Sequence, residues 1–121
     1  MISKFKAHLL IHGFALTHGT TAFFLDHVPV PGSATAALTA ETIAMVALIV
    51  KECGAGWTQA AIESFAAQQL AQYVGVTVAR EGAKYVPLFG PSFSACATTA
   101  ITEAIGWATY EACKVQSARN R

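Results

Sequence analysis

Residues 33–53 decide the fold of this chain and read SATAALTAETIAMVALIVKEC. From Leu38 to Val50 the stretch is apolar almost all the way round a helix, and Glu41 is its one early charge. A helix that is apolar on every side belongs in the middle of a helical bundle. Gly54 follows directly and suits a left-handed helix end. The sequence therefore predicts a central helix with other helices packed around it.

Breaks rich in Pro and Gly divide the rest of the chain. They fall at Val28–Gly32, Gly54–Gly56 and Val86–Pro91, and they predict helices over 3–25, 33–53, 58–84 and 92–117. Short connections make successive helices antiparallel neighbours. We therefore expect an all-α fold, a four-helix bundle of two antiparallel helical hairpins, in a single domain over residues 1–121. The helix over 58–84 carries the most polar face, and we expect that face to meet solvent.

Small residues and a weak internal repeat add detail to this expectation. Alanines four residues apart, at Ala36, Ala40 and Ala44 and again from Ala100 to Ala112, predict close helix packing. The stretch 27–43 also resembles 85–105, which places Glu41 and Glu103 at matching positions. Two interpretations stay open: two hairpins related by a pseudo-twofold axis, or chance similarity between helices rich in Ala and Thr.

The composition indicates that the chain buries a face against something else. Only 12% of its 121 residues are charged and 54% are hydrophobic, whereas a soluble domain averages about 25% charged. Such a surface fits contact between copies of the chain, a membrane surface or a partner protein. The 8 basic and 7 acidic residues form no strong basic field, apart from a basic C-terminal tail at 114–121. We therefore expect no nucleic-acid partner.

The N-terminal segment and the cysteines bear on location. Residues 7–25 carry no formally charged side chain, but three His, three Thr and two Gly make them a poor membrane span. A buried or interfacial helix, with Lys4 and Lys6 at its start, is the favoured interpretation. Three cysteines without CxxC spacing fit a reducing compartment. We expect a cytoplasmic protein, with peripheral attachment to the cytoplasmic face of the membrane as the alternative.

Two blocks of the sequence resemble a known family. The first block is Pro29–Gly32 followed by Ala37–Ala40 and Ile43–Met45, and the second is Lys84–Pro87 with Gly90 followed by Ala100–Gly106. Over residues 20–113 the order and spacing of these blocks resemble domain-of-unknown-function family 697, a bacterial helical module found beside small GTPase domains and in membrane-associated proteins.

The resemblance implies a separate GTPase as a partner. The chain itself has no phosphate-binding glycine loop followed by Lys-Ser or Lys-Thr. It also departs from the family, which has Asp, Pro and Gln where this sequence has Ala34, Ala36 and Thr42. A role for those polar side chains therefore does not carry over.

Four side chains are candidates for metal binding. His8 and His12 are four residues apart on one helix face, and Glu41 and Glu103 would face each other if the repeat holds. Ordinary packed or surface histidines, and capping or exposed glutamates, are the competing interpretation, because no HExxH or Glu-x-x-His pattern accompanies them. We therefore expect no cofactor and no catalytic site.

Aromatic side chains are the candidates for contact with a neighbour. The expected interface residues are Phe14, Phe23, Phe24, Trp57, Trp107 and Tyr110. Core and subunit contacts are favoured over a belt at a membrane interface. The leading hypothesis is a non-enzymatic structural or interaction module that forms a homo-oligomer. Its alternatives are a peripheral membrane protein and a small bundle that binds a metal or ligand.

Overall fold

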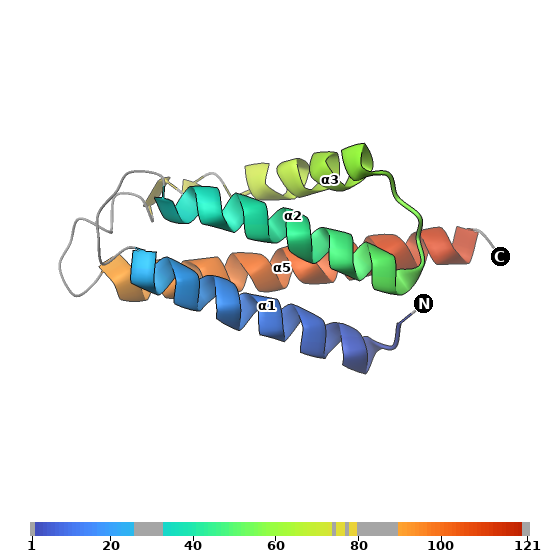
Figure 1. Cartoon of the computed structure of the whole chain (residues 1–121), viewed down its shortest axis with the longest axis horizontal. Helices are drawn as coiled ribbons and strands as arrows, with labels where there is room; N and C mark the ends of the chain where they lie inside the picture. Colours follow the sequence, from blue (N-terminus) through green and yellow to red (C-terminus); the bar gives the residue numbers. More distant parts are fainter. Residues whose placement is uncertain (1, 26–32, 74, 77, 80–89, 120–121) are drawn as a thin grey trace.

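A computed structural model describes residues 2–25, 33–73, 75–76, 78–79 and 90–119 of the chain. Its helices are α1 (Lys4–Leu25), α2 (Ser33–Cys53), α3 (Gln59–Ala71) and α5 (Gly90–Arg119). They alternate in direction and pack into an all-α four-helix bundle, as predicted (Figure 1). Successive helices are therefore antiparallel, as a pair of helical hairpins requires. The helices have 22, 21, 13 and 30 residues, so α1 and α2 match in length whereas α3 is much shorter than α5.

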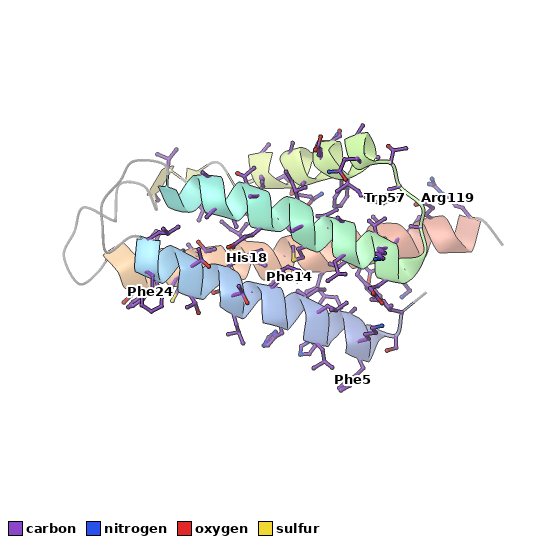
Figure 2. All side chains as sticks on the ribbon, in the orientation of Figure 1. Phe5, Phe14, His18, Phe24, Trp57 and Arg119 are labelled. Carbon is purple, nitrogen blue, oxygen red and sulfur yellow. The ribbon has the colours of Figure 1, made fainter. Side chains whose placement is uncertain are left out.

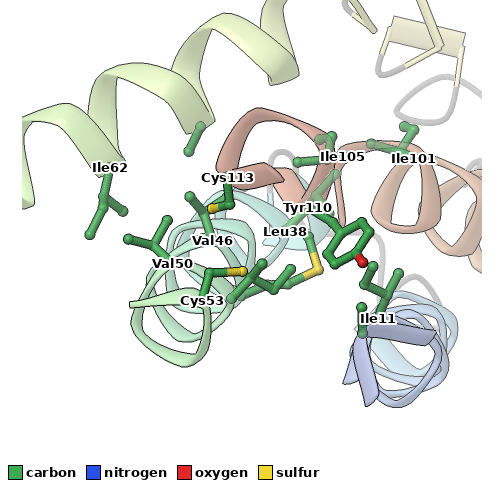
Figure 3. Close-up of a cluster of buried hydrophobic side chains, with 14 residues drawn as sticks. Ile11, Leu38, Val46, Val50, Cys53, Ile62, Ile101, Ile105, Tyr110 and Cys113 are labelled. Carbon is green, nitrogen blue, oxygen red and sulfur yellow. The ribbon is translucent and has the colours of Figure 1, made fainter. Parts of the chain in front are cut away.

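The α2 helix is the central element, as its apolar sequence predicts. It packs against α1, α5 and α3, whereas α1 and α3 lie on opposite sides of the bundle (Figure 1). Met45, Val46 and Ile49 are completely buried. They join one core with Ile11 of α1, Ile62 of α3 and Ile105 of α5, and Figure 3 shows most of this cluster. The apolar surface removed from water in this core is the main term that stabilises the fold.

The end of α2 follows the expected glycine cap. Gly54 has a φ of 68°, its amide donates to the carbonyl of Lys51 at 3.1 Å, and the Ala55 amide donates to Val50 at 3.2 Å. These two bonds form a Schellman motif, which satisfies carbonyls that the helix end leaves free. Thr58 then caps α3, because its hydroxyl accepts a hydrogen bond from the Ala61 amide at 3.1 Å. The turn between α2 and α3 is therefore fixed at both ends.

The expected continuous helix over 58–84 is wrong. The α3 helix ends at Ala71, and the amides of Gln72 and Tyr73 bond to carbonyls three residues earlier, at Gln69 and Leu70. The described residues 75–76 and 78–79 are helical again, so the expected helix is interrupted by a turn at Gln72 and Tyr73. The polar face of α3 does meet solvent, since Gln59, Glu63 and Gln68 are exposed.

The last helix is longer than the predicted 92–117. It begins at Gly90, with Pro91 in its first turn, where a missing amide hydrogen costs nothing. It continues through most of the expected basic tail to Arg119. The Pro29–Gly32 break and the stretch Lys84–Pro87 lie outside the described residues. Among the described helices, none combines the length and the apolar character needed to cross a bilayer.

The closest helix packing joins α1 and α5. A Cβ atom added to Gly106 of α5 would lie 2.6 Å from Cγ2 of Ile11, and one added to Gly19 of α1 would lie 2.2 Å from the Thr99 hydroxyl. The two helices therefore approach at these two glycines. Of the alanine pattern, Ala36, Ala40, Ala44 and Ala100 are exposed, whereas Ala104, Ala108 and Ala112 of α5 are partly buried. The fully buried alanines of α1 are Ala7, Ala15 and Ala22.

We predict that Gly106→Ala lowers the free energy of unfolding by about 1–2 kcal/mol, because the new methyl group overpacks the contact with Ile11. Urea denaturation followed by circular dichroism measures this change. In an Ile11→Ala background the two nearest atoms, Cγ1 and Cγ2, are absent and only the Cβ contact at 3.2 Å remains, so Gly106→Ala should cost much less there. An equal loss in both backgrounds contradicts the assigned contact.

Candidate functional site

A buried polar contact around His18 joins three helices. The side chain of His18 is 1% exposed and lies on α1 between α2 and α5 (Figure 2). Its Nδ1 is 2.9 Å from the Thr102 hydroxyl of α5, and its Nε2 is 3.4 Å from Oε2 of Glu41 in α2. The Thr102 hydroxyl donates to the Thr98 carbonyl at 2.8 Å, so it accepts from His18. The proton of neutral His18 is therefore on Nδ1, and Nε2 presents its lone pair to Glu41.

Burial favours the neutral forms of both His18 and Glu41. It lowers the pKa of His18 from 6.5 to about 4. It also raises the pKa of Glu41. A hydrogen bond between the Thr21 hydroxyl and the carboxylate lowers this pKa and partly offsets the rise. A protonated Glu41 carboxyl has a proton to donate toward Nε2 of His18. Thr102 is completely buried, so the contact links helices rather than facing solvent.

A second histidine cluster lies on the surface between α1 and α5. The rings of His8 and His12 stack with centroids 4.8 Å apart, and His12 Nδ1 contacts the Glu103 carboxylate. The other Glu103 oxygen accepts a hydrogen bond from the Trp107 indole at 3.2 Å, and His8 lies 5.9 Å from the Trp107 ring. The four side chains form a closed ring of contacts. His12 is more than half exposed, so this ring is open to solvent.

The metal candidates therefore divide into two places. His8, His12 and Glu103 come together, but Glu41 pairs with His18 instead of facing Glu103. The juxtaposition of the two glutamates that the internal repeat would allow is not seen, because each contacts a different histidine of α1. Within the part of the chain that the structure describes, no group of three His, Cys, Asp or Glu side chains has the arrangement to hold a metal ion.

The aromatic interface candidates occupy different environments. Tyr110 is buried in the core, and Phe14, Phe23, Trp57 and Trp107 are partly buried. Trp57 packs on Phe65 with ring centroids 5.3 Å apart, and its indole donates to Gln116. Among these six candidates, only Phe24 is exposed, at 66% (Figure 2).

Sequence reasoning found only part of an exposed apolar surface on α1, through Phe24 and the expectation of a buried or interfacial first helix. We call this surface the outer face of α1, and it consists of exposed residues on the side of the helix away from the bundle: Phe5, Leu9, Gly13, Leu16, Thr20 and Phe24. The four large side chains are 57–72% exposed. The hydroxyls of Thr17 and Thr20 donate to the carbonyls of Gly13 and Leu16 at 2.9 and 2.8 Å. The polar groups of this face are thus already satisfied within the helix.

Two shallow hollows lie on different sides of α1, and the second is the groove between α1 and α5. The first, of about 340 Å³, is lined by Leu9, Leu10, Gly13, Phe14 and Thr17. The second, of about 250 Å³, is lined by Leu16, Gly19, Thr20 and Phe23 of α1 with Ala95 and Thr99 of α5. The spacing of residues 5, 9, 16 and 24 was a usable signal. It was obscured because α1 is apolar on its buried side too.

The cysteines have contrasting environments. Cys53 and Cys113 are buried in the core, and Cys96 is exposed. Burial, together with neighbouring Cys53, raises the pKa of the Cys113 thiol to about 12. A thiol with so high a pKa carries very little of the reactive thiolate at neutral pH. Cys96 is therefore the thiol that reagents in solution reach first.

Comparison with family models, with curated proteins and with solved structures finds no match for this chain. The similarity to domain-of-unknown-function family 697 therefore stays a prediction, as does the GTPase partner that it implies. What the chain does has to be argued from its own surface.

We predict that His18 makes stability pH-dependent. Between pH 6.5 and about 4 the unfolded chain binds a proton at His18 that the folded chain does not, so the free energy of unfolding falls as the pH is lowered through this range. The full loss is about 3 kcal/mol. The raised pKa of Glu41 acts in the opposite direction. The folded chain binds a proton at Glu41 more tightly than the unfolded chain does, and this stabilisation is lost as the pH rises through the folded-state pKa of Glu41.

Urea denaturation of Glu41→Gln and of Glu41→Gln/His18→Gln, each from pH 4 to 7, isolates the contribution of His18. The first variant should show a steeper fall toward low pH than the second. NMR titration of the wild-type imidazole gives an independent reading. A midpoint near 6.5 for His18 would show that burial does not hold this ring neutral.

Proposed function

We propose that this chain is a non-enzymatic helical module that associates with further copies of itself through the outer face of α1. The observation that carries the proposal is the exposure of four large apolar side chains, Phe5, Leu9, Leu16 and Phe24, on one side of one helix. Large contiguous apolar patches on soluble proteins mark contact sites.

The extent of the face supports a contact between two copies. Covering an aromatic side chain removes ~150–250 Å² from water. Covering the exposed parts of these four side chains on two copies removes roughly 800–1,000 Å², before their neighbours are counted. Stable interfaces begin at about 1,000–1,200 Å². A second copy of α1 therefore supplies about the area that a stable dimer needs.

The charges around the face also suit self-association. Between Lys6 and the end of α1 the helix has no formally charged side chain, so two copies meet without repulsion between like charges. Lys6 itself is paired with Glu52 of α2 at 2.8 Å. Because the threonine hydroxyls are bonded to their own helix, burying the face leaves few polar groups without partners.

We predict that the wild-type chain is a dimer at low micromolar concentration, and that Leu16→Glu makes it monomeric by burying an unpaired charge in the contact. Size-exclusion chromatography with light scattering measures the mass. Val115→Glu is the matched control, since Val115 is 51% exposed on α5, outside the proposed contact. A monomeric wild-type chain, or equal dissociation by both variants, contradicts the proposal.

Association with a membrane surface is the second candidate. The exposed Lys4 and Lys6 at the start of α1, beside Phe5 and Leu9, are the feature that favours it, because basic and apolar side chains together bind lipid interfaces. Flotation with vesicles containing anionic lipid separates the two functions. A self-associating module stays at the bottom of the gradient, and Leu16→Glu changes its mass. A membrane-bound chain floats, and Leu16→Glu reduces the floating fraction.

A further inference from the structure

We propose that Cys53 of α2 and Cys113 of α5 form a disulfide when the protein is oxidised, and that this bond crosslinks the central helix to the last helix. The inference does not depend on the proposed self-association, because both thiols lie in the core of a single chain. It rests on three features that bring the two side chains together: the register of α2 and α5, hydrogen bonds just beyond the two cysteines, and the contact between the thiols.

The register of α2 and α5 brings the two cysteines to the same level of the bundle. These helices run in the same direction (Figure 1), and His18 contacts Glu41 of one and Thr102 of the other. Cys53 follows Glu41 by 12 residues, about 18 Å along a helix. Cys113 follows Thr102 by 11 residues, about 16.5 Å. The heights of the two cysteines along the bundle therefore differ by only about 1.5 Å.

Hydrogen bonds from Gln116 hold the chain beyond the two cysteines together. Gln116 lies three residues after Cys113 in α5. Its side-chain amide donates to the carbonyl of Ala55, two residues after Cys53, at 3.3 Å. Its side-chain oxygen accepts a hydrogen bond from the indole of Trp57. Because one side chain of α5 binds the turn after α2 at two points, the end of α2 is held against α5.

The two thiols meet inside the core. Cys53 is 8% exposed and Cys113 is 1% exposed, and Figure 3 shows both in the buried cluster between the helices. Burial raises the pKa of the Cys113 thiol to about 12, and the charge of Cys53 and a hydrogen bond between the two thiols add to the rise. Thiols that reach each other in this way need only small side-chain rotations and backbone shifts to reach an S–S bond length of about 2.05 Å.

A low-molecular-weight disulfide is the class of oxidant that closes the bond by exchange. The thiolate of Cys53, the less buried of the pair, attacks one sulfur of the oxidant, which gives a mixed disulfide and releases one small thiolate. The thiolate of Cys113 then attacks the Cys53 sulfur, breaks the mixed disulfide and releases the second small thiolate. The two protons that the cysteines lose end on the released thiolates. Two protein thiols are thereby oxidised, and one small disulfide is reduced to two thiols.

Burial makes this exchange slow in both directions. Only the thiolate attacks, and a pKa of about 12 leaves Cys113 almost entirely as the thiol at neutral pH. In the reverse reaction a reductant attacks the Cys53 sulfur and Cys113 is the leaving group, and a thiolate of high pKa leaves slowly. We therefore expect the disulfide to form slowly and to outlast a brief exposure to the oxidant.

Oxidation of the Cys96→Ser variant tests the proposal. This variant lacks the exposed thiol, so crosslinks between copies through Cys96 are avoided. In a buffer of oxidised and reduced glutathione, the folded chain should lose both remaining thiols and the mass of two hydrogen atoms. Mass spectrometry of an unreduced tryptic digest should then find the peptides that contain Cys53 and Cys113 joined. Because the reaction is slow, equilibrium is also approached from chain that was oxidised in urea and refolded.

The equilibrium constant for closing the disulfide shows whether the fold places the two thiols. It should be about 30- to 1,000-fold larger for the folded chain than for the chain in urea, which is the range expected for a bond that suits the native structure. By linkage, the same bond raises the midpoint of thermal unfolding by roughly 8–16 °C. Calorimetry of the oxidised and reduced forms measures this shift.

Two variants with a single core thiol are the matched controls, Cys53→Ala/Cys96→Ser and Cys96→Ser/Cys113→Ala. Alanine is used in the core because a buried serine hydroxyl would need a hydrogen-bond partner. Neither control should gain stability in the oxidising buffer. The pairing is overturned by a mixed disulfide with glutathione as the final product, by equal equilibrium constants in the folded and unfolded chains, or by a lower midpoint of unfolding after oxidation.

Discussion

The close approach of α1 and α5 is the constraint on which the rest of the structure depends. At Gly106 and Gly19 the two helices come so near that even a methyl group would meet a side chain of the neighbour. This spacing places His18 within hydrogen-bonding distance of Thr102 and His12 in contact with Glu103. The inner side of α1 combines Ile11 and His18 with small residues, and four of its large apolar residues remain on the outside.

The fold could be predicted from the sequence because its signals are local. The apolar run from Leu38 to Val50 defined the central helix, and Gly54 defined its end. The third helix was overextended because the pattern of polar and apolar residues continues beyond Ala71, whereas the chain makes a turn at Gln72 and Tyr73. The alanine pattern was right only for part of α5, because small residues permit close packing but do not determine which helix face is buried.

The site was only partly predictable because its contacts are distant in sequence. His8 and His12 share a helix face by spacing alone, and their stacking follows from it. The partners of His18 lie on two other helices, and no local pattern indicates which side of α1 meets them. The outer face of α1 could not be predicted for the same reason. The helix is apolar on all sides, so its exposed side is identified only when the side that meets α2 and α5 is known.

Because α3 lies at the edge of the bundle, local stability differs between this helix and the rest of the fold. This helix packs mainly on α2, through Ile62 and Ala66, and touches α5 only slightly. Detaching it exposes few apolar side chains and leaves the paired helices α1 and α5 undisturbed. Local unfolding requires the least free energy where the fewest buried contacts are broken. Fluctuations that open the amides of α3 to exchange with solvent can thus occur while the opposite side of the molecule stays closed.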